Sequence, residues 1–185
     1  LTQAGDSALM LACAFSTVDV VKFLVKGQCS DINTASSNPQ GQRHNRPALV
    51  QRPHDGLTLL HMAIQCHEEP LPIIEFLVQA FPWMLTAVEY RYTRTPLHWL
   101  CCTNNTTRRT TQVNQSLLEL LVQHNRTPLL TMDRYLETPL HVAQRFQLEP
   151  SLVQFLSSKT SEYETTTWTK SVLGRLMVQM RAHER

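Results

Sequence analysis

Apolar residues recur along this chain in four pairs of short stretches, separated by polar segments. In the first stretch of each pair, a leucine lies two residues after a serine or threonine, and a second apolar residue lies three positions further on. In the second stretch, branched and aromatic residues lie three and four positions apart. Both spacings place apolar side chains on one face of a helix. The pattern therefore predicts four pairs of short amphipathic helices.

The four first stretches are versions of one phrase. They begin at Ser7, Thr58, Thr95 and Thr138 and read S-A-L-M-L-A, T-L-L-H-M-A, T-P-L-H-W-L and T-P-L-H-V-A. A serine or threonine at this point can cap a helix by accepting a hydrogen bond from a free backbone N–H. Proline in the next position fits the first helical residue, where no N–H is needed. The second stretches are residues 20–25, 73–78, 117–122 and 152–156, and Pro70 and Pro150 start two of these helices.

The repeated phrase resembles the T-P-L-H-x-A signature of the ankyrin repeat, whose period is about 33 residues. This resemblance implies an all-α fold, an ankyrin-repeat solenoid of stacked helix-turn-helix units with short hairpin fingers. Neither helix of a unit can bury its apolar face alone, so neighbouring units must share a continuous core. The four units cover about residues 3–158, and roughly three are enough for a stable stack.

The repeat pattern ends after Leu156. Residues 157–167 are rich in serine and threonine and are interpreted as a connector. Trp168, Val172, Leu176 and Met180 then recur every four residues, which predicts an amphipathic helix with a basic polar face. That helix is expected to cap the end of the stack or, alternatively, to dock on another subunit. The predicted domains are therefore the repeats, residues 1–158, and a tail, residues 159–185.

The units are longer than the family's period, because their capping residues lie 51, 37 and 43 residues apart. The surplus falls near residues 35–53 and 103–114, which are predicted to be projecting loops. Long loops are tolerated because closure entropy grows slowly with length, but loops also carry binding sites, so both interpretations stand. The finger glycine is present as Gly5 and Gly56 and is replaced by Thr93 and Leu136. This replacement predicts a different geometry for the third and fourth fingers.

Cysteine content, net charge and the length of the apolar runs indicate which compartments and which classes of ligand fit this chain. Five cysteines form an odd set without paired spacing, which favours free thiols in a reducing, intracellular compartment. The cytoplasm is the first choice; an organelle is the alternative, because the chain begins within a repeat and a targeting segment or further repeats can precede Leu1. A net charge of +2 does not by itself indicate nucleic acid. No apolar run approaches the roughly 20 residues of a membrane span.

Histidine is the residue type here that most suggests catalysis or metal binding. His61, His98 and His141 occupy the fourth position of the phrase, where the resemblance implies structural hydrogen bonds that connect neighbouring repeats. The cysteines lack the spacing of a zinc site. The sequence contains no glycine-rich phosphate loop and no nucleophile motif. It therefore predicts a protein that is not an enzyme and that uses no cofactor or metal.

The resemblance also implies where a partner binds, because ankyrin repeats hold ligands at the fingertips and on the exposed side of the first helices. Two Arg-Tyr pairs fall at the third and fourth fingertips, and both residue types are enriched among binding hot spots. Trp99, in a first helix, is interpreted either as an anchor for the partner or as core. The predicted partner-binding residues are Arg91, Tyr92, Arg94, Trp99, Arg134, Tyr135, Glu137, Arg145 and Phe146.

Arginines line the predicted finger edge and continue into the first insertion as Arg43, Arg46 and Arg52. This line favours a protein partner with an acidic or mixed acidic-apolar surface. The first hypothesis is therefore an adaptor or scaffold that binds another protein. A structural subunit of a larger assembly is the second hypothesis. Nucleic-acid binding through the same arginines is the third, and the low net charge argues against it.

Overall fold

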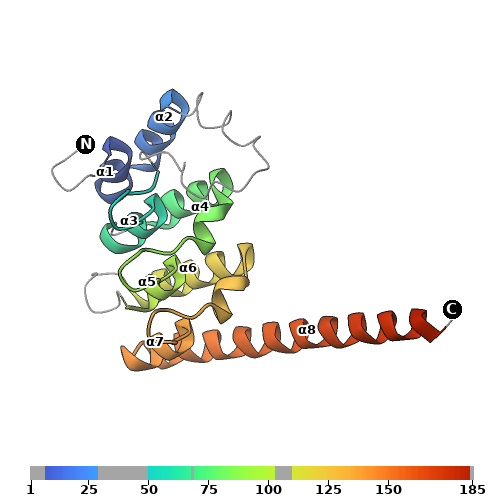
Figure 1. The fold of residues 1–185 in the computed structure, drawn as a ribbon. Helices are drawn as coiled ribbons and strands as arrows, with labels where there is room; N and C mark the ends of the chain where they lie inside the picture. Colours follow the sequence, from blue (N-terminus) through green and yellow to red (C-terminus); the bar gives the residue numbers. More distant parts are fainter. Residues whose placement is uncertain (1–6, 29–49, 68, 103–109, 184–185) are drawn as a thin grey trace.

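The computed structural model describes residues 7–28, 50–67, 69–102 and 110–183, and it shows a stack of helix pairs (Figure 1). The first helices pack side by side in one layer and the second helices in another. The first layer contains α1 (Ala8–Phe15), α3 (Leu59–Cys66), α5 (Pro96–Cys102) and α7 (Pro139–Arg145). The second contains α2 (Val18–Gln28), α4 (Leu71–Ala80), α6 (Thr111–His124) and the start of α8 (Pro150–His183). The prediction of an all-α repeat solenoid is confirmed.

Each first helix begins at the capping residue that the phrase predicted. The Ser7 hydroxyl accepts a hydrogen bond from the Met10 N–H at 3.1 Å. At Thr58 and Thr138 the cap is reciprocal, because the histidine three residues later accepts the backbone N–H of the capping threonine. In an ordinary capping box a glutamate or glutamine has this role. The T-P-L-H phrase is therefore a capping box in which histidine is the returning side chain.

A continuous apolar core runs through the stack between the two layers of helices. Its fully buried members come from every unit and include Leu9, Leu60, Ile74, Leu118 and Leu156. Two short 3-10 helices, η2 (Pro82–Thr86) and η4 (Thr127–Leu130), follow α4 and α6 and add Met84 and Leu129 to it. Because each helix buries one face only, removal of any unit would expose the apolar faces of its neighbours.

The fingers keep one backbone geometry whether or not they contain glycine. Gly56 has φ of 76°, and the equivalent residues Thr93 and Leu136 have φ of 55° and 61°. All three residues have the left-handed backbone conformation, so the prediction of a different geometry in the third and fourth fingers is wrong. Hydrogen bonds of the finger backbone hold this conformation, including Leu136 N–H to Asp133 C=O at 3.0 Å. Left-handed backbone at a residue with a side chain costs roughly 1–2 kcal/mol.

Leu136→Asn should therefore stabilise the protein, by about 0.5–1 kcal/mol, because asparagine tolerates left-handed backbone better than leucine. The Leu136 side chain is 76% exposed, so little burial is lost. Urea denaturation of the variant beside wild type measures the change. Met132→Asn is the matched control, since Met132 is also largely exposed and lacks a positive φ. Equal midpoints for Leu136→Asn and wild type would show that Leu136 carries no backbone strain.

The C-terminal segment differs from its prediction. Helix α8 runs from Pro150 to His183 without a break, so the connector predicted at residues 157–167 does not exist, and the helix crosses the predicted domain boundary at 158. The threonine hydroxyls form hydrogen bonds within the helix. The Thr166 hydroxyl donates to the Glu162 carbonyl at 2.7 Å, and the Thr167 hydroxyl donates to the Tyr163 carbonyl at 2.7 Å. Serine and threonine lower helix propensity by only about 0.5 kcal/mol each, and residues 157–167 contain no glycine or proline that would end the helix.

The start of α8 packs on α6, α7 and η4, so it closes this end of the stack (Figure 1). The predicted insertions near residues 35–53 and 103–114 fall mostly outside the described residues, as do Gly5, Arg43 and Arg46. Where the second insertion is described, its end is helical, because Thr110 caps α6 and residues 111–114 form the first turn. The side chains of Trp168, Val172, Leu176 and Met180 also lie outside the described part.

Candidate functional site

The third and fourth fingers are joined to form one surface. The Arg134 N–H donates to the Tyr92 carbonyl at 2.8 Å, and one unit earlier the Tyr90 N–H donates to the Asp55 carbonyl at 2.7 Å. These bonds link the backbones of successive fingers. We call the side chains that project from the last two fingers and from the end of α7 the finger surface: Arg91, Tyr92, Arg134, Tyr135, Arg145 and Phe146.

Aromatic rings and guanidinium groups alternate across the finger surface. The rings of Tyr92 and Tyr135 lie 6.2 Å apart, centroid to centroid, with a tilt of 31°. The Arg91 guanidinium lies 5.0 Å from the centre of the Tyr92 ring. At the other end, the Arg145 guanidinium lies 5.8 Å from the Tyr135 ring and 5.1 Å from the Phe146 ring. Cation–π contacts of this length are attractive, so they hold the side chains in one row.

Two buried carboxylates that the sequence analysis did not single out organise the fingers from beneath. Glu89 accepts backbone N–H bonds from Arg91 and Tyr92, both at 2.7 Å, and from Arg94 at 3.2 Å. Asp133 accepts the N–H groups of Tyr135 at 2.8 Å and Glu137 at 3.1 Å. Acidic residues at the start of a turn often accept hydrogen bonds from backbone N–H groups two or more residues later. The positions of Glu89 and Asp133 before the two fingers are therefore the sequence feature from which their role could have been predicted.

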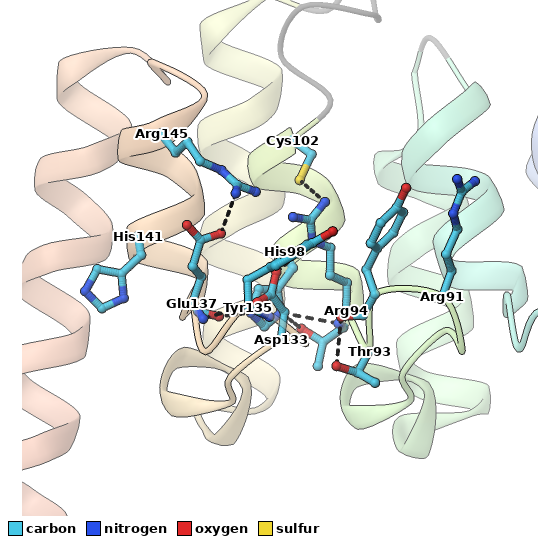
Figure 2. Close-up of polar contacts among 12 residues, drawn as sticks. Arg91, Thr93, Arg94, His98, Cys102, Asp133, Tyr135, Glu137, His141 and Arg145 are labelled. Atoms are coloured by element: carbon cyan, nitrogen blue, oxygen red, sulfur yellow. Dashed lines mark hydrogen bonds and ion pairs between the residues drawn. The ribbon is translucent and has the colours of Figure 1, made fainter.

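Arg94, which we predicted among the partner-binding residues, is part of this support, and its side chain does not lie on the finger surface. The residue is 8% exposed, and its Nε lies 3.0 Å from an Asp133 carboxylate oxygen (Figure 2). Burial works to raise the pKa of Asp133, but the hydrogen bonds from Arg94 and from the Glu137 and Tyr135 N–H groups hold it below its ordinary value. Arg94 thus connects the third finger to the fourth.

Glu137 is half-buried, and its carboxylate pairs with Arg145 at 3.0 Å (Figure 2). The pair connects the fourth finger to the last turn of α7, and it partly neutralises Arg145. All three arginines of the finger surface are exposed, but Arg91 and Arg134 differ from Arg145 because neither has an ion pair with a carboxylate among the described residues. The net charge that the finger surface offers to a partner is therefore positive and is carried mainly by these two arginines.

Apolar groups lie exposed beside the two arginines. Tyr90, Met132 and Tyr135 are each more than half exposed, and Leu136 is more exposed still. All four belong to the third and fourth fingers or their immediate approaches. Large apolar groups beside unpaired arginines are characteristic of surfaces that bind proteins, because they combine area with directional contacts.

Trp99 faces the core and does not belong to the finger surface. Its ring is half-buried, packs on the Ala14, Leu57 and Met62 cluster, and meets the His61 ring edge-on at 6.0 Å. Of the two interpretations of Trp99, the geometry matches the core one. In the second finger, Leu57 is also buried, and Arg52 pairs with Asp55 at 3.1 Å. The second finger therefore contributes less exposed charge than the sequence suggested.

Two of the three phrase histidines bridge successive units. His61 Nε2 lies 3.2 Å from the Arg94 carbonyl, and His98 Nε2 lies 3.1 Å from the Glu137 carbonyl. In both residues Nδ1 faces the backbone N–H of the capping threonine, so the bonds assign the neutral tautomer with its proton on Nε2. Burial lowers the pKa of His61 to about 4 and also lowers the pKa of His98. His141, in the last unit, is exposed.

Other features of the described residues are less suited to a site. A shallow groove of about 670 Å³ between α7 and α8 is lined largely by Gln144, Leu148, Gln154 and Ser157. Within the described ranges, no three side chains of histidine, cysteine, aspartate or glutamate lie close enough to hold a metal ion. None of the described helices combines the length and apolar composition that crossing a membrane requires.

The stacked helix pairs and joined fingers define the class of helical repeat proteins. Comparison with known families agrees: the ankyrin repeat family matches residues 4–37, which include the first helix pair. The phrase and its capping geometry recur in the three later units. The chain is therefore similar to ankyrin-repeat proteins, by the family match at residues 4–37 and by its helical repeat fold. No curated protein matches its sequence.

Proposed function

We propose that this chain is a non-catalytic interaction module, an adaptor or scaffold, that binds another protein through the finger surface. The observation that carries the proposal is the row of Tyr and Arg side chains across two fingers whose backbones are hydrogen-bonded together. Ankyrin repeats generally bind proteins and are typically not catalytic, which supports the proposal. Tyrosine and arginine supply much of the binding energy at protein interfaces.

The charges indicate the kind of partner. The carboxylates of Asp133 and Glu137 are paired with arginines, so the exposed Arg91 and Arg134 dominate the electrostatic potential of the surface. Exposed apolar groups from Tyr90, Met132 and Leu136 lie on the same fingers. A protein surface with acidic side chains around an apolar centre complements this arrangement.

Nucleic-acid binding is less well supported than it was from the sequence. That hypothesis needed a line of six arginines along the finger edge. Two of them, Arg52 and Arg94, are paired with aspartates, and Arg43 and Arg46 lie outside the described residues. Two exposed arginines give a weak electrostatic footprint for a phosphate backbone.

The test is affinity purification of the tagged, nuclease-treated protein, with wild type beside an Arg91→Ala/Tyr135→Ala variant. We expect wild type to recover a stoichiometric protein partner. The variant should bind that partner roughly thirty-fold more weakly in a titration of the purified proteins, since one hot spot is typically worth about 2 kcal/mol. Both side chains are largely exposed, so the variant should fold normally.

Glu119→Ala/Gln123→Ala is the matched control, because these two residues are exposed on α6, a second-layer helix. It should bind as wild type does. A partner that binds the Arg91→Ala/Tyr135→Ala variant with unchanged affinity would place the interface elsewhere. Recovery of nucleic acid alone, when nuclease is omitted, would contradict the proposal.

A further inference from the structure

Two guanidinium groups flank a pair of tyrosine rings on the finger surface. The rings of Tyr92 and Tyr135, which we call the ring pair, lie 6.2 Å apart, centroid to centroid. The Arg91 guanidinium lies 5.0 Å from the Tyr92 ring, and the Arg145 guanidinium lies 5.8 Å from the Tyr135 ring. Figure 2 shows Arg91 and Arg145 toward opposite sides of the drawn residues. The order across the surface is therefore cation, ring, ring, cation.

The backbone beneath the ring pair fixes the spacing of the two rings. The Arg134 N–H, one residue before Tyr135, donates to the Tyr92 carbonyl at 2.8 Å. Glu89 accepts the Tyr92 N–H at 2.7 Å, and Asp133 accepts the Tyr135 N–H at 2.8 Å. Both carboxylates are buried. Each ring therefore extends from a finger that a buried carboxylate holds in place, and the two fingers are bonded to each other.

An extended peptide has nearly the same spacing along each of its faces. Its side chains alternate between two faces and rise by about 3.3 Å per residue, so neighbours on one face are about 6.6 Å apart. This distance is close to the 6.2 Å between the two rings. A helical ligand instead lays a broad apolar stripe into a hydrophobic groove, whereas this row has a cation at each end. The surface therefore fits an extended ligand better than a helical one.

We propose that the finger surface binds an extended segment of its protein partner in which two apolar side chains lie between two acidic ones, every second residue facing the fingers. The apolar side chains lie over the ring pair, and the carboxylates form charge-assisted hydrogen bonds with Arg91 and Arg145. Arg134, exposed on the same finger as Tyr135, adds positive charge beside them. This inference rests on the proposed function, because it names the chemistry of the partner at the same site.

Glu137 reduces the positive charge that Arg145 offers to such a segment. The Glu137 carboxylate lies 3.0 Å from an Arg145 nitrogen, and the Arg145 side chain is 43% exposed. A guanidinium has five N–H donors, so Arg145 can bind a second carboxylate beside Glu137. The negative charge of Glu137 opposes that second carboxylate. Removal of this charge should therefore strengthen the binding of an acidic ligand, an effect that a purely structural role for Glu137 would not produce.

Fluorescence anisotropy of the full chain with two labelled peptides tests the pattern. The matched peptide, G-S-E-S-L-S-L-S-E-S-G, places both glutamates and both leucines on one face of an extended chain. The shifted peptide, G-S-S-E-L-S-L-E-S-S-G, has the same composition but turns the glutamates to the opposite face. The matched peptide should bind with a Kd on the order of 10–100 µM, and the shifted peptide should bind roughly fivefold more weakly.

Variants of the chain assign the two acidic contacts. Arg91→Ala and Arg145→Ala should each weaken the binding of the matched peptide roughly fivefold. Arg126→Ala is the control, because it removes a partly exposed arginine beside η4, which does not belong to the finger surface. It should leave the Kd unchanged.

Glu137→Gln should strengthen the binding of the matched peptide roughly threefold, but not that of a peptide in which glutamines replace both glutamates. Glu119→Gln, which removes the same charge from α6, should leave the Kd unchanged. A matched peptide that does not bind, equal binding of the matched and shifted peptides, or no gain with Glu137→Gln would each overturn the inference. If a purified partner still depends on Arg91 and Tyr135 in that case, the proposed function stands and only the extended acidic segment is excluded.

Discussion

Asp133→Ala should lower the free energy of unfolding by about 3–5 kcal/mol, the usual cost of removing one partner of a buried ion pair. The Asp133 side chain is fully buried and that of Arg94 is 10% exposed, so the guanidinium left behind has little access to water. The N–H groups of Tyr135 and Glu137 also lose their acceptor. Unfolding in guanidinium chloride at pH 7, with the variant beside wild type, measures the loss of stability.

Two further variants, Asp133→Asn and Glu162→Ala, test whether the loss comes from the buried ion pair. Asp133→Asn keeps an acceptor oxygen and removes the charge, so it should lose less stability than Asp133→Ala. Glu162→Ala breaks an exposed pair with Arg126, which has a side-chain N···O distance of 2.7 Å and side chains more than two-fifths exposed. Exposed pairs contribute little, so this control should remain close to wild type. Similar losses for Asp133→Ala and Glu162→Ala would mean that Asp133 does not support the fingers.

Acidification from pH 7 to pH 5 should cost about 2 kcal/mol of stability through His61 alone. Its pKa is about 4 in the folded protein against 6.5 for an ordinary histidine. Between these values the unfolded chain binds a proton that the folded chain does not, so the free energy of unfolding falls as the pH falls. His98, whose pKa burial also lowers, adds in the same direction.

Urea denaturation at pH 7 and pH 5 tests this, with His61→Gln beside wild type. Glutamine does not titrate, so the variant should lose about 2 kcal/mol less over this interval, whatever its stability at pH 7. An equal loss in both proteins would show that proton uptake by His61 does not drive the acid sensitivity.

The helix pairs and their starting points were predictable because their causes are local. A capping threonine, a proline in the first helical position and a histidine three residues later act within one turn, as at Thr138, Pro139 and His141. Apolar spacing then specified which face of each helix is buried. The continuous α8 was missed because threonine was interpreted as a loop signal, whereas inside a helix its hydroxyl can donate to the preceding turn.

Much of the candidate site was not predictable from the sequence, because its causes are contacts between distant residues. Arg94 resembles the neighbouring Arg91 in the sequence, and only its contact with Asp133, 39 residues away, shows that it is buried support. The left-handed conformation of Thr93 and Leu136 is likewise held by the hydrogen bonds of each finger rather than by residue preference. Arg91, Tyr92, Arg134 and Tyr135 were placed at the fingertips correctly because each lies within a few residues of a capping threonine.

The backbone bonds from Tyr90 to Asp55 and from Arg134 to Tyr92 have a consequence for recognition. Moving one of these fingers away from the next would break a backbone hydrogen bond, so folding already restricts their conformational freedom. A partner that binds the finger surface, as we propose, would then order few additional groups on binding. The affinity should then depend on how well the partner's spacing matches the interval between fingers. A change of one residue in the length of a finger would alter selectivity even where every contacting side chain stays the same.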